Sequence, residues 1–88
     1  MPQPVHGPED ISPGDIYEDC AYHPCLCLGI DGLAIWGVSL VDGSHPRSCD
    51  IGACGIRKLT PEEAWVWKTR GPQDVPDEAP MSPERRWW

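Results

Sequence analysis

The chain has 88 residues and a formal net charge of −7, with 11 prolines, 9 glycines, 5 cysteines and no phenylalanine. A chain this short excludes a large enzymatic core, and its acidity does not favour binding to nucleic-acid phosphates or anionic membranes. A small body with few large apolar side chains usually needs a disulfide, a metal ion or a partner for its stability.

Proline and charge divide the chain into three parts. Eight of the 11 prolines lie in residues 1–13 and 71–88. We therefore expect a flexible N-terminal arm at 1–13, a folded domain at 14–71 and an acidic, proline-rich tail at 72–88 that ends in aromatic residues. The first residues lack the basic and apolar regions of a signal peptide, and no stretch approaches the about 20 apolar residues of a membrane helix. These features predict a cytoplasmic protein without a membrane segment.

Residues 15–41 have the pattern of β-strands. The alternation in "DIYED" predicts a short half-buried strand at 15–19. "CLCLGI" at 25–30 is a second candidate, with Cys25 and Cys27 on one face. Asp31-Gly32 then predicts a hairpin into the apolar run 33–41, and Gly37 inside this run suggests a bulge or a close backbone approach.

The remaining elements are a loop at 42–48, a tight turn at 49–54, a short strand at 55–59 and one helix. Thr60 is the expected helix N-cap, Pro61 takes the first helical position and Glu63 completes a capping box. Gly71 and the proline after it should end the helix. This order predicts a mainly β fold, either a small SH3-like barrel or a curled antiparallel sheet, with one C-terminal helix.

The cysteines form two groups separated by the predicted hairpin. Two turns that each supply a pair of thiolates suit a tetrahedral structural zinc site, whose binding energy would stabilise the small fold. Pro24 fixes the backbone before Cys25, which slightly favours Cys27 as a ligand. The predicted zinc ligands are Cys20, Cys27, Cys49 and Cys54, with Cys25 or His23 as the alternative to Cys27.

Other interpretations of these residues stay open. The cysteines can be packed, reduced thiols without metal, or disulfides if the compartment is oxidising. A catalytic thiol paired with histidine is not favoured, because nothing marks an oxyanion site or a third orienting group, and we do not expect an enzyme. The adjacent carboxylates Glu18 and Asp19 are explained by solvation alone.

The tryptophans indicate a protein partner. Trp65 and Trp67 are two residues apart on the predicted helix, so one should pack on the sheet while the other is exposed and available to a partner. Trp87 and Trp88 resemble a short docking element on the tail, although they can equally be an idle apolar end.

The sequence thus predicts a small non-enzymatic accessory or protein-binding module that a structural zinc ion stabilises. One alternative is a metal-handling or thiol-redox protein that uses the same cysteines. A nucleic-acid-binding zinc module is the other, and the net charge disfavours it.

Overall fold

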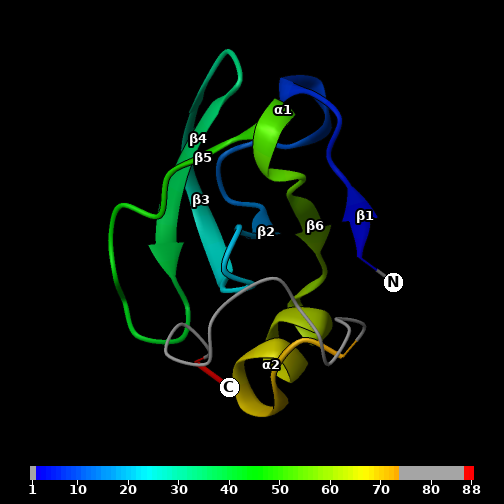
Figure 1. Cartoon of the computed structure of the whole chain (residues 1–88), viewed down its shortest axis with the longest axis vertical. Helices are drawn as coiled ribbons and strands as arrows, with labels where there is room; N and C mark the ends of the chain where they lie inside the picture. Colours follow the sequence, from blue (N-terminus) through cyan, green and yellow to red (C-terminus); the bar gives the residue numbers. More distant parts are fainter. Residues whose placement is uncertain (1, 74–86) are drawn as a thin grey trace.

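The computed structural model describes residues 2–73 and 87–88, with the backbone alone for Cys54. Six strands form one mostly antiparallel sheet in the order β1-β6-β2-β3-β4-β5 (Figure 1). The strands are β1 (Gln3–Pro4), β2 (Ile16–Glu18), β3 (Pro24–Asp31), β4 (Ala34–Ser39), β5 (Cys49–Asp50) and β6 (Arg57–Leu59). A short 3-10 helix η1 (Pro8–Asp10), a four-residue helix α1 (Ile51–Cys54) and the longer helix α2 (Pro61–Arg70) complete the described fold.

The sheet is not closed into a barrel. β1 and β5 are its two edge strands, and they do not pair with each other in the described part of the chain. In Figure 1, α1 and η1 lie at one end of the body and α2 lies at the other. The predicted mainly antiparallel sheet with one substantial helix is confirmed at this level.

The β3–β4 hairpin confirms the turn signal in the sequence. Asp31 pairs with Ala34, so Gly32, with φ +60°, begins the two-residue connection. On β4, a Cβ atom at Gly37 would lie 2.1 Å from the backbone oxygen of Leu26, and this close approach explains the glycine. The register shifts between Cys27 and Gly29 on the opposite strand.

Two apolar clusters lie on opposite faces of β2. Tyr17 is fully buried in the larger cluster, whose buried members are Val5, Ile11, Tyr17, Cys25, Cys27, Ile35, Ile51 and Ile56. Ile16 instead packs against the smaller cluster, in which Leu59 of β6 meets Ala64 and Trp67 of α2. The strand predicted to be half-buried is therefore covered on both faces, because α2 packs over the second one.

The first 13 residues contribute to this body. β1 pairs with β6, and Val5 and Ile11 are buried in the larger cluster. The segment expected to be a flexible arm is thus part of the fold over residues 2–13. Of the tail predicted at 72–88, residues 74–86 lie outside the described residues.

Helix α2 follows its sequence signals closely. Thr60 Oγ1 accepts a hydrogen bond from the Glu63 backbone N–H, and Glu63 Oε1 accepts one from the Thr60 N–H. Gly71 caps the other end, with φ +84° and its N–H donating to the Trp67 carbonyl. The predicted capping box and the stop at Gly71 are both confirmed.

Candidate cysteine cluster and tryptophan surface

Cys20 and Cys49 meet at the surface, although the hairpin separates them in sequence. Cys20 lies in the turn after β2, Cys49 begins β5, and their Sγ atoms are 3.5 Å apart. Cys20 is disulfide-bonded, whereas Cys49 is a free thiol. The structure therefore brings together one cysteine from each of the two predicted groups.

Asp19 and Arg47 hold the two chain segments in place. Asp19 Oδ1 accepts hydrogen bonds from the backbone N–H groups of Ala21 and His23, which closes the turn that carries Cys20. Arg47 donates from Nε and Nη2 to Asp19 Oδ2, both at 2.9 Å. Arg47 lies two residues before Cys49, and its carbonyl also accepts a 2.6 Å hydrogen bond from the Tyr17 hydroxyl. This network fixes the approach of the two sulfurs.

A surface pocket of about 240 Å³ adjoins the pair. Its lining residues are Asp19, Cys20, Ala21, Pro46, Arg47, Ser48 and Cys49. Burial raises the pKa of the Cys49 thiol, while the nearby Arg47 charge acts in the opposite direction. The cluster is thus accessible from the surface, but Cys49 is not strongly activated as a thiolate.

Cys25 and Cys27 have a different environment. As predicted, they share one face of β3, and that face points into the larger apolar cluster, where both residues are buried. The Cys25 thiol donates to the His23 carbonyl and the Cys27 thiol donates to the Gly29 carbonyl. Burial raises the pKa of both thiols. These two cysteines have the contacts of small core residues.

His23, the other alternative ligand, is also buried. Its Nδ1 lies 2.9 Å from Ser39 Oγ, and its ring centroid lies 5.1 Å from that of Trp87. Among the side chains that the structure describes, no group of three His, Cys, Asp or Glu residues is arranged to hold a metal ion. The fourth predicted ligand, Cys54, ends α1, and its side chain is outside the described residues.

The two helix tryptophans lie on opposite sides of α2, as predicted. Trp67 is 4% exposed, and its indole Nε1–H donates to Glu18 Oε2 at 2.6 Å. Trp65 is 65% exposed. A shallow groove of about 230 Å³ begins beside Trp65, and we call it the Trp65 groove. Its lining residues are Ile16, Leu40, Pro61, Ala64, Trp65 and Lys68.

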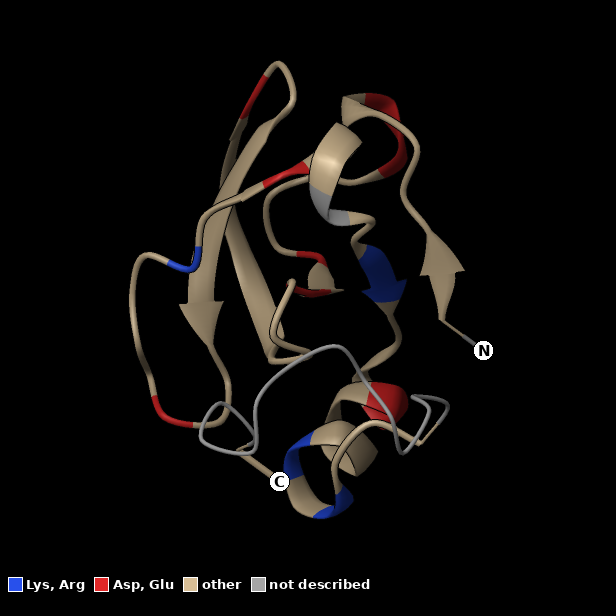
Figure 2. Ribbon diagram, viewed as in Figure 1, with Lys and Arg blue, Asp and Glu red and all other residues tan. Residues whose placement is uncertain are grey.

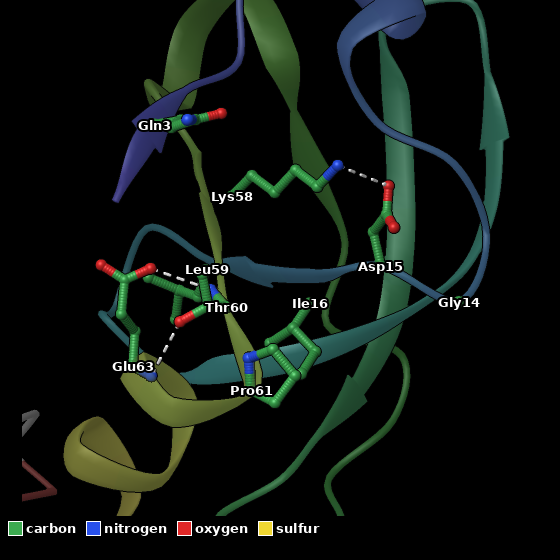
Figure 3. Close-up of a pocket in the computed structure, with 9 residues that line it drawn as sticks. All are labelled: Gln3, Gly14, Asp15, Ile16, Lys58, Leu59, Thr60, Pro61 and Glu63. Carbon is green, nitrogen blue, oxygen red and sulfur yellow. Dashed lines mark hydrogen bonds and ion pairs between the residues drawn. The ribbon is translucent and has the colours of Figure 1, made fainter. Parts of the chain in front are cut away.

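A larger pocket of about 320 Å³ lies near the start of α2 (Figure 3). Four of the polar side chains that line it already have partners: Lys58 Nζ lies 3.4 Å from Asp15 Oδ2, and Glu63 and Thr60 each accept the other's backbone N–H in the capping box. These groups stabilise the local fold, so we do not assign a ligand to this pocket.

The charges of the described residues give no continuous cationic face. Figure 2 shows acidic residues on several elements, while the basic residues lie in three separate places, namely β6, the loop before β5 and α2. The helices within the described ranges are all too short or too polar to span a bilayer.

No protein-family model matches the chain, and neither a curated protein nor a solved structure gives a match.

The sequence did not point to Ala21, Tyr22 or Gly71, which contact the C-terminal tryptophans. Trp87 Nε1 donates to the Ala21 carbonyl at 2.9 Å, and the rings of Trp88 and Tyr22 are 5.8 Å apart. Their only distinguishing sequence signal is the glycine at the helix end, which capping explains equally well.

Proposed function

We propose that this chain is a small accessory module that binds a protein partner through Trp65 and the groove beside it. The observation that carries the proposal is the 65% exposure of Trp65 at the rim of an apolar groove. Trp is enriched among residues that dominate binding energies, and an exposed indole beside an apolar groove offers a partner both an anchor and a recess.

The size of the Trp65 groove and the charge of the chain indicate the kind of partner. At about 230 Å³ the groove is smaller than the pockets of about 300–1,000 Å³ that hold drug-sized ligands, but it can accept one apolar side chain. The net charge of −7 favours a partner segment with basic residues around that side chain. We therefore propose a basic peptide segment with a single apolar residue that enters the groove.

Peptide selection tests this proposal. Random peptides displayed on phage are selected against the immobilised protein, and the affinities of the enriched peptides are then measured by fluorescence anisotropy. We expect an apolar residue flanked by Lys or Arg, and Trp65→Ala should weaken binding by about 2 kcal/mol, or nearly thirtyfold. Leu33→Ala is the matched control, because Leu33 is 48% exposed in the hairpin connection. Equal binding to the Trp65→Ala variant, or no enriched peptide, would contradict the proposal.

We further propose that zinc stabilises the module when its cysteines are reduced. In a tetrahedral site with Zn–S bonds of about 2.3 Å, the sulfurs are roughly 3.8 Å apart. The 3.5 Å separation of Cys20 and Cys49 is close to that value. Reduction would free Cys20 as a thiolate, and Cys54 would complete the proposed ligand set together with Cys27, or with Cys25 or His23 in its place. We also propose that the sheet is related to SH3-like barrels. The protein that we propose is cytoplasmic.

The same contact favours a thiol-redox role as the second candidate. A disulfide sulfur at Cys20 with a free thiol 3.5 Å away is a starting geometry for thiol–disulfide exchange. Attack by the Cys49 thiolate would form a Cys20–Cys49 disulfide and release the sulfur previously bound to Cys20 as a thiolate. The exchange conserves the number of disulfides and needs no external oxidant.

Native mass spectrometry with metal analysis separates the two candidates. Protein purified under reducing conditions without chelator should carry one zinc ion per chain, which Cys20→Ser and Cys49→Ser should each abolish. Matched Cys25→Ser and Cys27→Ser variants then identify the remaining ligand. If that protein is metal-free, a second sample is purified without reductant, and peptide mapping that finds both Cys20 and Cys49 in disulfides would favour the redox role. Metal-free protein with Cys49 always reduced would contradict both.

A further inference from the structure

The last two residues of the chain pack against the body. The ring centroids of Trp87 and His23 are 5.1 Å apart, and those of Trp88 and Tyr22 are 5.8 Å apart in an edge-to-face arrangement. Trp87 also donates its indole N–H to the Ala21 carbonyl at 2.9 Å. Figure 1 shows the C-terminus beside α2. Two ring contacts and a hydrogen bond thus hold one dipeptide.

The turn that receives the tryptophans has an unusual backbone. Tyr22 has φ +64°, which is uncommon for a residue other than glycine, asparagine or aspartate and has an energetic cost. The Asp19 carboxylate stabilises this conformation through the N–H groups of Ala21 and His23. An aromatic side chain is therefore presented from a turn position where glycine or asparagine would be less strained. Strained residues of this kind cluster at functional sites.

Gly71 provides the opposite side. A Cβ atom at this position would lie 2.7 Å from Cβ and Cγ of Trp88, so any side chain here would displace the tryptophan. The adjoining pocket of about 320 Å³ is formed by the last turn of α2, Val41 and the two C-terminal tryptophans. The glycine that caps the helix also leaves room for the indole. We call Ala21, Tyr22, His23 and Gly71 the aromatic site.

We propose that the aromatic site is a receptor for a chain end that carries two adjacent tryptophans, and that Trp87–Trp88 of a second copy can replace the chain's own pair in it. Each contact that the site makes is one that a Trp-Trp segment from another copy can reproduce. The chain's own Trp87–Trp88 and that of a second copy differ only in their effective concentration at the site, which the covalent tether of the chain's own pair raises to the millimolar range. The chain's own end therefore prevents exchange until it is removed or outcompeted.

Binding of a labelled peptide to the full-length chain tests the proposal. The probe is a fluorescent peptide of residues 82–88, SPERRWW, and the receptor is the full chain with Trp87→Ala and Trp88→Ala. We expect saturable binding, which should be weaker by about tenfold or more for the wild-type chain because its site is occupied. The peptide SPERRAA should not bind, and Leu33→Ala, added to the double variant at an exposed position in the hairpin connection, should leave the affinity unchanged.

Tyr22→Asn, added to the double variant, tests the site itself. Asparagine tolerates positive φ, so this change removes the aromatic ring while it retains the turn. We expect the affinity for the peptide to fall by about fivefold, as for the loss of one aromatic contact. Equal binding of the peptide to wild type and double variant, or no binding to either, would overturn the proposal.

A measurement on the unaltered protein covers the case in which the double variant does not fold. In NMR spectra the Trp87 indole N–H, which is bonded to the Ala21 carbonyl, should exchange with solvent more slowly than that of the exposed Trp65. An excess of the unlabelled peptide should accelerate its exchange. Equally fast exchange of the two indoles, or no response to the peptide, would overturn the proposal.

Discussion

Glu18 and Asp19 are adjacent in the chain, and both are buried, yet they perform different structural tasks. Glu18 accepts from Arg57 Nε and Nη2 at 2.9 and 2.8 Å, and its side chain is 4% exposed. Asp19 accepts from Arg47 in a similar way, and its side chain is 5% exposed. Both arginine side chains are 25% exposed. The two ion pairs are thus nearly equal in burial.

The difference lies in what each carboxylate connects. Glu18 joins three elements, because it lies on β2, pairs with Arg57 on β6 and accepts the indole N–H of Trp67 on α2. Asp19 acts locally on the turn that carries Cys20 and Tyr22, and it ties this turn to the loop that carries Arg47. The comparison teaches that one pair attaches the helix to the sheet, whereas the other shapes the candidate sites.

Breaking the Glu18 pair should have the largest effect. Glu18→Gln removes the negative charge from a buried side chain that accepts hydrogen bonds from Arg57 and from the Trp67 indole, and we expect a loss of about 3 kcal/mol in the free energy of unfolding. Urea denaturation measures this loss. Glu62→Gln is the matched control, because Glu62 is exposed at the start of α2, and it should change stability by less than about 1 kcal/mol. Equal losses for the two variants would contradict the role given to Glu18.

Breaking the Asp19 pair should have a smaller and more local effect. In Asp19→Asn, the remaining amide oxygen can still accept the two backbone N–H groups, but the charged hydrogen bonds to Arg47 are lost. We expect a loss of about 2 kcal/mol. The variant should also increase the alkylation of Cys49 by iodoacetamide, because Arg47 no longer holds the loop against the turn. Alkylation at the wild-type rate would show that Cys49 is held without this pair.

Local signals explain why the sequence predicts part of this fold well. The capping box at Thr60 and Glu63 needs only residues within one turn of helix. The Asp31-Gly32 hairpin depends on a two-residue connection whose glycine adopts positive φ. In both cases the residues that carry the signal are also the ones that make the contacts.

The interpretation of Glu18 and Asp19 as solvated carboxylates was wrong, because their partners are distant in sequence. Arg57 lies 39 residues after Glu18, and Arg47 lies 28 residues after Asp19. Carboxylates are rarely fully buried without a partner, so an isolated strand pattern predicts exposure. The same limit applies to Cys20 and Cys49, whose separation of 3.5 Å depends on how the turn and loop are tied together.

A substitution at Trp67 can remove one of the hydrogen bonds that Glu18 accepts and leave those from Arg57 in place. Trp67→Phe retains most of the apolar side chain but removes the N–H that donates to Glu18 Oε2 at 2.6 Å. We expect a loss of about 1 kcal/mol, in the range of one hydrogen bond together with a modest loss of packing. Thermal unfolding followed by circular dichroism measures it. Trp65→Phe, two residues away and exposed, should unfold as the wild type does, and an equal loss would contradict the different roles of the two faces of α2.

The smallest effect should come from Asp42, an exposed carboxylate whose main stabilising contact is a hydrogen bond within its own loop. Its Oδ1 accepts the backbone N–H of Ser44 at 2.9 Å, and this hydrogen bond lowers the pKa of Asp42 from 3.8 to about 2. Between these values the unfolded chain binds more protons than the folded one, so this contribution is present above about pH 4 and is lost as the pH falls towards 2. Because Asp42 is exposed, Asp42→Asn should change stability at pH 7 by no more than about 0.5 kcal/mol. The difference from wild type should disappear at pH 2. A difference of several kcal/mol at pH 7 would mean that a locally bonded surface carboxylate can matter as much as the buried pairs, and burial would then not explain the larger effects expected for Glu18 and Asp19.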